Sequence, residues 1–175
     1  MGLYGHPFVV RAADIDETMD IHADPAAQVA AVSRRKALAV PRNPEDVVVA
    51  ADTIVVCAGE ILGKPKDAAD AARMLRLLSG RAHQVMTGCT VVYGERVESF
   101  TEVTHLHFRS LRPEEIARYV ASGEPMDKAG AYGIQGGAAL FCTGLEGDYY
   151  NVMGLPVCRL GETLRRIAPK WMEDA

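Results

Sequence analysis

Apolar positions recur at helical spacing in four parts of the chain. In residues 68–79 they share one helical face, with Asp67 placed to cap the first turn and Gly80 to end the last. A second helix is predicted from Pro113 to the stop signal at Gly123, because proline suits the first helical turn. The same pattern predicts helices over residues 25–38 and 156–167.

Runs of apolar and β-branched residues predict strands between these helices. They cover residues 8–11, 47–50, 53–58, 83–93, 97–108 and 138–143. The two longest runs are separated only by Gly94-Glu95-Arg96, which predicts a long antiparallel hairpin. We therefore expect an α/β fold in which helices flank a twisted sheet of mixed strand orientation. No repeat or long linker divides the sequence, so we expect a single domain over residues 1–175.

One carboxylate, Asp52, interrupts the apolar residues 47–58. A valine-rich run predicts a strand buried on both faces, where an ionised carboxylate is costly unless a cation or hydrogen-bond donors meet it. Asp52 is therefore the leading candidate for a functional acid. The structural alternative is a carboxylate that caps local backbone amides, with Thr53 assisting.

Two lysines, Lys64 and Lys66, follow in a short, stiff Gly-Lys-Pro-Lys turn. Ammonium groups at a turn suit a polyanion such as a phosphate chain, bridged to Asp52 by a divalent metal. Solvated surface lysines are the plain alternative, and the same holds for Lys36 in the third predicted helix. A nucleotide site is the first hypothesis that these residues generate.

Two further segments combine glycines with polar side chains. Residues 124–137 hold so many glycines that the chain must turn tightly or lie close against a partner, because each glycine costs backbone entropy. Backbone amides in such a loop can read the edge of a base, and Gln135 offers both a donor and an acceptor. Residues 147–156 place polar and aromatic side chains before a helix start, which also fits a packed turn.

An acidic cluster, Asp14, Asp16 and Glu17, lies between a predicted strand and a predicted helix. Acidic residues in such loops are usually solvated or cap a helix. By itself the cluster is therefore a weak functional signal, and other charged groups must converge with it to give it a role.

Composition narrows the class of partner. The 175 residues are 49% hydrophobic and 24% charged, as in a globular protein, and carry a formal net charge of −4. No cluster of five or more basic residues occurs, which argues against a nucleic-acid polymer as partner. Apolar stretches fall short of the roughly 18 residues that span a bilayer, and the four cysteines are scattered. We expect a soluble protein of the cytoplasm, with no membrane partner.

Several of these segments resemble the Maf nucleotide pyrophosphatases, a family also described as septum-formation inhibitors. The matching residues occur in the family's order over nearly the whole chain. They are Asp14-Ile15-Asp16-Glu17-Thr18, Arg35-Lys36-Ala37, Ala51-Asp52-Thr53, and residues 59–65, 78–83, 124–136 and 146–156. No single motif has to support the resemblance by itself.

The resemblance implies a Maf-like fold and an enzyme that hydrolyses nucleoside triphosphates to the monophosphate and pyrophosphate, with Mg²⁺ or Mn²⁺. It makes Asp52 the catalytic carboxylate, either as proton acceptor or as organiser of the metal, with Glu17 as its acidic companion at the substrate and metal. Lys36 and Lys64 become phosphate ligands. Thr53 and Gln135 match the substrate-binding residues that mark members preferring dTTP and UTP. The family also implies a cytoplasmic homodimer.

One part of the family pattern lies outside this sequence. Family members normally begin with a strand and a Ser-x-Ser-Pro-Arg-Arg loop that contacts the phosphates, and Met1 aligns with the end of the helix that follows. The resemblance therefore predicts an N-terminally shortened domain with reduced activity. Two alternatives stay open: a nucleotide-binding module with impaired catalysis, and a pyrophosphatase for purine nucleotides with damaged or non-standard bases.

Overall fold

The computed structural model describes residues 7–20 and 23–173. The described strands form one sheet of five strands in the order β2-β1-β3-β4-β5. Their bounds are Val47–Cys57 (β1), Glu60–Leu62 (β2), Ala82–Tyr93 (β3), Arg96–Phe108 (β4) and Cys142–Glu146 (β5). The predicted long hairpin is present as β3 and β4, which pair in register from Ala82↔His107 to Tyr93↔Arg96.

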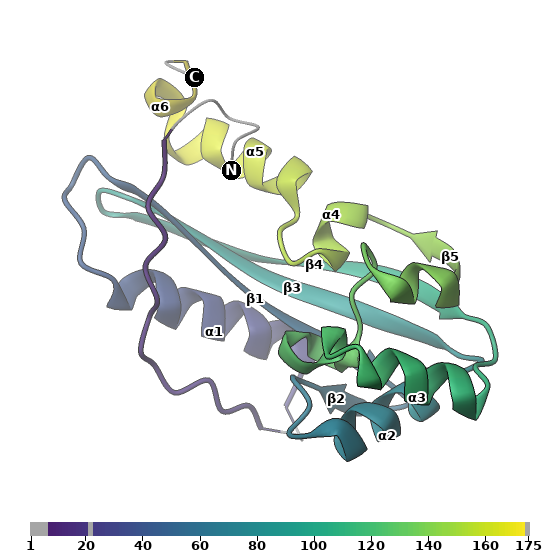
Figure 1. The fold of residues 1–175 in the computed structure, drawn as a ribbon. Coiled ribbons are helices and arrows are strands. Elements are labelled where there is room, and N and C mark those ends of the chain that lie inside the picture. Colours follow the sequence, from purple (N-terminus) through teal and green to yellow (C-terminus); the bar gives the residue numbers. More distant parts are fainter. Residues whose placement is uncertain (1–6, 21–22, 174–175) are drawn as a thin grey trace.

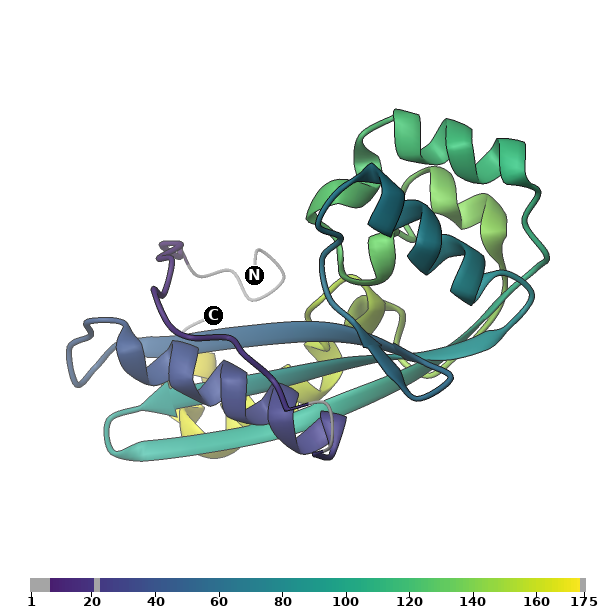
Figure 2. The same cartoon turned by 90° about the horizontal axis from the view of Figure 1, so that it is seen from below.

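Helices flank this sheet. They are Pro25–Ala39 (α1), Ala68–Leu78 (α2), Pro113–Ala121 (α3), Tyr149–Val152 (α4), Val157–Ile167 (α5) and Pro169–Glu173 (α6), with 3-10 helices at Glu124–Asp127 (η2), Ala129–Ala131 (η3) and Gly137–Phe141 (η4). Helices α1 and α5 lie on opposite faces of the long strands (Figure 1). Figure 2 shows α2 and α3 gathered at one end of the sheet. The α/β fold with a long antiparallel hairpin and flanking helices is confirmed.

The four predicted helices are present within one or two residues of their expected ends. Asp67 caps α2 as predicted, because its Oδ1 accepts a hydrogen bond from the Asp70 backbone amide at 2.8 Å. Short elements such as β2 and α4 had no periodic signal long enough to predict them. Over the described ranges, no helix has the length and apolar character that crossing a membrane would need.

Two predictions about the sheet were wrong: one strand, and the orientation of the strands. Residues 8–11 have no regular structure, and Phe8, Val9 and Val10 are 58%, 79% and 84% exposed. Within the described residues this run pairs with no other strand, and without a ladder an apolar run does not become a strand. The expected mixed orientation was also wrong. All pairs of described strands are antiparallel, because turns and helical connections reverse the chain between neighbours.

Two further differences concern the limits and burial of strands. The runs 47–50 and 53–58 are one continuous strand, β1, and most of its residues are half-buried where burial on both faces was expected. The predicted strand 138–143 divides into η4 and β5. Ala138 and Phe141 are buried three residues apart, which is the repeat of a 3-10 helix.

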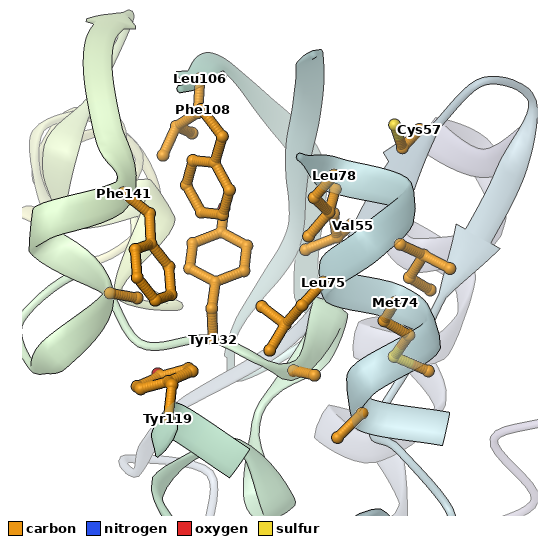
Figure 3. Packing of buried hydrophobic residues seen from close by; sticks show 14 of the residues in the cluster. Val55, Cys57, Met74, Leu75, Leu78, Leu106, Phe108, Tyr119, Tyr132 and Phe141 are labelled. Atoms are coloured by element: carbon orange, nitrogen blue, oxygen red, sulfur yellow. The ribbon is translucent and has the colours of Figure 1, made fainter. Parts of the chain in front are cut away.

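The largest hydrophobic cluster joins α2 and α3 to the ends of β1, β3 and β4 (Figure 3). Leu75 and Leu78 of α2 are completely buried beside Val55 of β1. Phe108 and Tyr132 pack edge to face with ring centroids 4.9 Å apart, a favourable aromatic geometry. The apolar face that the sequence predicted for α2 therefore anchors this end of the molecule.

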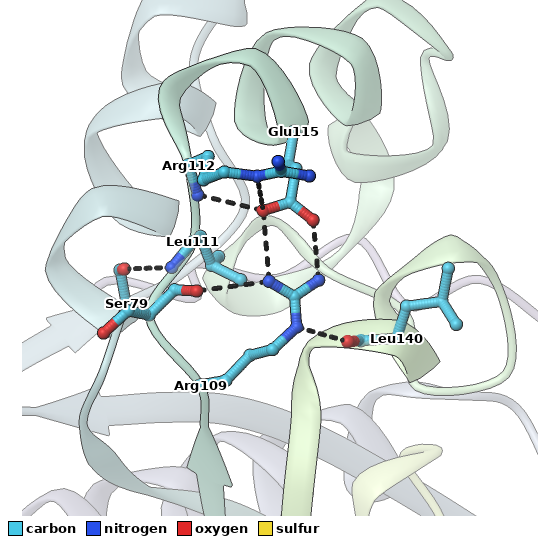
Figure 4. Close-up of polar contacts among 7 residues, drawn as sticks. Ser79, Arg109, Leu111, Arg112, Glu115 and Leu140 are labelled. Atoms are coloured by element: carbon cyan, nitrogen blue, oxygen red, sulfur yellow. Dashed lines mark hydrogen bonds and ion pairs between the residues drawn. The ribbon is translucent and has the colours of Figure 1, made fainter.

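An arginine–carboxylate pair fixes α3 to the end of β4 (Figure 4). Arg109 donates from Nη2 to Glu115 Oε1 at 2.7 Å and from Nη1 to Glu115 Oε2 at 3.1 Å. The hydrogen bond from Arg109, followed by that from the Arg112 backbone amide, lowers the pKa of Glu115 to about 2. This pair holds the start of α3, the helix whose Tyr119 supports the glycine-rich segment.

Helix α1 packs tightly on the sheet at Gly88 of β3. A Cβ atom added at Gly88 would overlap the backbone carbonyl of Val29 in α1. One turn further along the helix, Ser33 Oγ forms a buried hydrogen bond with Thr90 Oγ1 at 2.8 Å. Gly88 is the register partner of Asp52 in β1. The depth at which α1 packs therefore also sets how close its side chains come to Asp52.

We expect Gly88→Ala to lower the free energy of unfolding by about 1–3 kcal/mol, because the backbone of α1 must move to admit the methyl group. Urea unfolding followed by circular dichroism measures the change. Gly63→Ala is the matched control, since a Cβ atom there meets nothing within 4 Å. It should change stability by less than about 1 kcal/mol. A Gly88→Ala protein as stable as the wild type would contradict this close packing.

A buried histidine makes the stability of the folded protein depend on pH. His83 is 3% exposed, and its Nε2 lies 2.9 Å from the hydroxyl of Tyr132. Burial lowers the pKa of His83 from 6.5 to about 4. Between these pH values the unfolded chain binds a proton at His83 that the folded chain does not bind. The stability that depends on neutral His83 is therefore complete above pH 6.5 and is lost as the pH falls toward 4.

We expect the free energy of unfolding of the wild type to fall between pH 6.5 and 4 by about 3 kcal/mol more than that of His83→Gln. The glutamine variant retains a polar side chain but cannot titrate in this range. Guanidinium unfolding at a series of pH values gives both slopes. Parallel slopes would show that His83 does not titrate as described.

Candidate functional site

A cleft of about 1090 Å³ opens at the outer edge of β1. Strand β2 pairs with β1 only from Val55 to Cys57, so the preceding part of β1 has no strand on its outer side within the described residues. The cleft consequently reaches both faces of the strand. Asp52 projects toward α1, and its neighbour Thr53 projects toward α4 on the opposite face.

All six residues that the sequence predicted for the site line this cleft. They are Glu17, Lys36, Asp52, Thr53, Lys64 and Gln135. They come from the loop before α1, from α1, β1 and the turn after β2, and from the glycine-rich segment. The structure thus brings together residues that lie far apart in the sequence, while their chemical roles stay predictions.

Lys36 joins the two predicted acids. Its Nζ lies 2.7 Å from Asp52 Oδ1 and 2.9 Å from Glu17 Oε1. The side chains of Lys36 and Asp52 are 20% and 12% exposed, whereas that of Glu17 is 53% exposed. The cation that the carboxylate in this apolar strand was expected to need is therefore the ammonium group near the end of α1.

The protonated state of Lys36 is stabilised in this setting. Burial by itself would lower the pKa of Lys36, but the hydrogen bonds and charges of Asp52 and Glu17 together outweigh it. The pKa is raised above its ordinary value of 10.5. Lys36 is consequently a fixed positive charge between two acidic side chains.

The other cleft lysines differ in their partners. Lys128 pairs with Asp127 at 2.7 Å, whereas Lys64 has no carboxylate within 4.0 Å of its ammonium group in the described part of the chain. The pKa of Asp127 is lowered, first by the hydrogen bond from Lys128 and to a smaller extent by the charge of Lys64. Lys66 is not among the residues that line the cleft, so the two turn lysines do not act as the pair that the sequence suggested.

The glycine-rich segment forms one wall of the cleft and has little room for side chains. Gly130 has φ +68°, and a Cβ atom there would lie 2.8 Å from Val55 Cγ2. Its backbone amide donates to Gly63 O at 3.0 Å, which joins this wall to the turn that carries Lys64. A Cβ atom at Gly136 would overlap the carboxylate of Glu124. The close approach expected from these glycines is therefore present.

Glu124 and Tyr119 hold this wall in place. Glu124 Oε1 accepts a hydrogen bond from the Tyr119 hydroxyl at 2.9 Å, and Oε2 accepts one from the Gly137 amide at 3.1 Å. The Tyr119 hydroxyl also accepts from the Gly133 amide at 3.0 Å. These contacts fix the backbone on both sides of Gln135, which lines the cleft.

Several supporting residues were not found from the sequence. The glycine at position 88 within an apolar strand was an available signal of close packing. Tyr119 and Glu124 carried no comparable signal, because their role exists only once α3 lies beside residues 133–137. In the acidic cluster, Asp16 Oδ1 accepts from the Thr18 amide at 2.9 Å, so its role is the local turn.

The acidic residues fit a hard divalent cation. Asp52 and Glu17 converge on a single ammonium group, so their oxygens can share one positive charge. Within residues 7–20 and 23–173, no three histidine, cysteine or acidic residues are grouped so that they could hold a metal ion by themselves. Mg²⁺ is commonly bound by one or two carboxylates, with substrate phosphates and water as the remaining ligands. This donor set matches that pattern.

The antiparallel α/β fold and a cleft lined by acids and lysines define a class of protein suited to phosphate-containing ligands. A family model described as Maf-like protein matches residues 1–167. The chain belongs to the Maf family.

Three similar curated proteins carry the same name. A dTTP/UTP pyrophosphatase of Moorella thermoacetica is 52% identical over 163 residues, which cover 91% of this chain and 84% of that protein. The protein of the same name from Symbiobacterium thermophilum is 52% identical over 162 residues, covering 91% and 83% of the two chains. The one from Bacillus cytotoxicus is 47% identical over 161 residues, covering 91% and 84%.

We expect Lys36→Met to lower the free energy of unfolding by about 1–3 kcal/mol near neutral pH, because the largely buried Asp52 loses its ionic partner. Glu17→Gln is the matched comparison. Its more exposed carboxylate should contribute less than about 1 kcal/mol.

The pH dependence gives a second test of Lys36. Because its pKa is raised, its contribution is complete below pH 10.5 and is lost as the pH rises through the higher folded-state value. Chemical denaturation near pH 7 and near pH 11 measures the stability gap between wild type and Lys36→Met. A gap that stays unchanged at the higher pH would contradict the ionic role.

Proposed function

We propose that this chain is a nucleoside triphosphate pyrophosphatase that hydrolyses dTTP and UTP to the monophosphate and pyrophosphate. The observation that carries the proposal is the convergence of Asp52, Glu17 and Lys36 in one open cleft that also holds Lys64. The names of the relatives support the same activity. The cleft volume of about 1090 Å³ is sufficient for a nucleotide.

In the proposed reaction, a water oxygen bonds to the α-phosphorus, and the bond from that phosphorus to the α,β-bridging oxygen breaks. Catalysis of such a step depends chiefly on positioning and on neutralising charge. Asp52 orients the attacking water and accepts its proton. Lys36 holds Oδ1 of Asp52 at 2.7 Å, while Oδ2 has no hydrogen-bond partner within the described residues. This carboxylate is therefore fixed at one oxygen and available at the other.

The phosphates are bound by lysines and a divalent cation in this proposal. Lys64 is suited to a phosphate because its charge is not already paired with a described carboxylate. Lys36 lies beside the reacting end and shares its charge between the acids and the substrate. Asp52 and Glu17 would hold Mg²⁺ or Mn²⁺, which when bound would neutralise charge on the phosphate oxygens.

In this proposal the base lies beside Thr53 and Gln135, which provide hydrogen-bonding groups in the cleft. Apolar side chains line the same cleft and suit the flat faces of a base. They include Ile61, Ile134 and Met153. The pyrimidine preference is part of the proposal and rests on Thr53, Gln135 and the relatives' names.

Further expectations accompany the proposed activity. All four cysteines are free thiols, which suits a reducing compartment. The cytoplasmic location, the homodimer and the single domain over residues 1–175 stay predictions.

We expect the purified protein with Mg²⁺ or Mn²⁺ to release pyrophosphate from UTP and dTTP, and Asp52→Asn to lower kcat by about 100-fold or more. A coupled pyrophosphate assay measures both. Asp46→Asn is the matched control, because Asp46 lies in the loop before β1 and does not line the cleft. This control should retain the wild-type rate.

The outcomes separate the competing functions. Nucleotide binding by calorimetry without pyrophosphate release would identify the non-catalytic module. Faster turnover of ITP than of UTP and dTTP would favour the purine alternative. Wild-type turnover by Asp52→Asn would remove Asp52 from the reaction.

A further inference from the structure

A chain of hydrogen bonds leads from the cleft into the sheet. Thr53 Oγ1 in the cleft wall lies 3.0 Å from Thr87 Oγ1 on the neighbouring strand β3. Thr87 Oγ1 in turn lies 3.1 Å from the backbone carbonyl oxygen of Asn151 in α4. Thr87 is completely buried and does not line the cleft, so it acts on a ligand through its neighbours, and Thr53 is the hydrogen-bond partner of Thr87 that lines the cleft.

The direction of these hydrogen bonds follows from counting protons. A carbonyl oxygen can only accept, so Thr87 must donate its single hydroxyl hydrogen to Asn151 O. Thr87 then has only lone pairs left for Thr53. Thr53 must therefore be the donor in the contact at 3.0 Å, and its own hydrogen is directed into the sheet.

The end of the chain of hydrogen bonds is rigid. The side-chain Nδ2 of Asn151 donates to Val85 O at 3.1 Å and to Thr104 Oγ1 at 3.0 Å. The Asn151 carbonyl also accepts from the Gly154 amide at 2.9 Å. Asn151 is completely buried. The acceptor that orients Thr87 is thus held to β3 and β4 independently of any ligand.

With its hydrogen directed away, the Thr53 hydroxyl offers the cleft only lone pairs. It can accept a hydrogen bond from an N–H group and meets a second acceptor unfavourably. Uracil and thymine carry an N–H at ring position 3, whereas cytosine carries a lone pair there. A fixed acceptor that faces ring position 3 can therefore distinguish these bases without a change in shape.

We propose that Thr87 is a positioning residue that fixes the Thr53 hydroxyl as a hydrogen-bond acceptor and thereby favours uracil and thymine nucleotides over cytosine nucleotides. This inference rests on the proposed function for the identity of the ligand. Its new element is Thr87, which touches no substrate and acts only through the orientation of Thr53.

The test compares the binding of α,β-methylene-UTP and α,β-methylene-CTP by calorimetry in the presence of Mg²⁺. We expect the wild type to bind the uridine compound about tenfold or more tightly than the cytidine compound. Thr87→Val retains the shape but removes the acceptor for Thr53, so this affinity ratio should fall toward one. Thr87→Ser retains the hydroxyl and should restore the ratio.

Thr90→Val is the matched control. Thr90 is equally buried on the same strand, but its hydroxyl contacts Ser33 at 2.8 Å and Ser99 at 2.9 Å on the opposite face. This variant should lose stability while the affinity ratio stays at the wild-type value. An effect that depends only on weakened folding would change the ratio in both valine variants.

Two results would overturn the inference: an affinity ratio in Thr87→Val equal to that of the wild type, or a wild type that binds both compounds equally. The second result can be obtained even if Thr87→Val does not fold, because it is measured on the wild type. Binding of these non-hydrolysable compounds does not depend on turnover. If the wild type releases pyrophosphate but Thr87→Val keeps the wild-type affinity ratio, the role of Thr87 is rejected and the catalytic proposal stands. If the wild type binds the uridine compound selectively but releases no pyrophosphate from UTP or dTTP, the catalytic proposal is rejected and the role of Thr87 stands.

Discussion

The close packing of α1 on β3 is the constraint on which the site depends. The helix can approach the sheet at this depth only because position 88 has no side chain, since any Cβ atom there would overlap the Val29 carbonyl. Gly88 stands opposite Asp52, so the same approach brings Lys36 within 2.7 Å of that carboxylate. A packing requirement in the interior of the sheet therefore sets an electrostatic arrangement at its edge.

The second determinant is the outer edge of β1, which within the described residues has no strand partner before Val55. A strand edge offers backbone groups and side chains of both faces to the same space, and natural proteins usually cover such an edge. Here β2 covers only Val55 to Cys57, and the cleft occupies the part that precedes it. The glycine-rich segment closes the opposite wall, held by the Tyr119–Glu124 contact. Asp52 and Thr53, which we propose for the reaction and for reading the base, are neighbours in sequence whose side chains project from opposite faces of this strand.

The regular elements could be predicted where local signals were strong. Helix α2 carries an N-cap, an apolar stripe and a C-terminal glycine, and each of these acts within a few residues. Strand predictions were less secure because a strand requires a partner. Residues 8–11 have the composition of a strand but pair with no described strand, and residues 138–143 divide between a 3-10 helix and β5. The antiparallel orientation of every described strand pair was likewise not predicted, because the turns and helices that connect the strands set it.

By itself, the sequence determined which chemical groups this protein can use. An acid in an apolar strand, lysines at a turn and at a helix end, and a glycine-rich segment with Gln135 all follow from residue type and local pattern. The tertiary structure decided which of them meet. It made Lys36 the partner of Asp52, separated Lys66 from Lys64, and gave Thr87 and Glu124 supporting positions that no local pattern indicates. The physical reason is that ion pairs and hydrogen bonds act over a few ångströms, whereas these residues are joined only by the folding of distant segments.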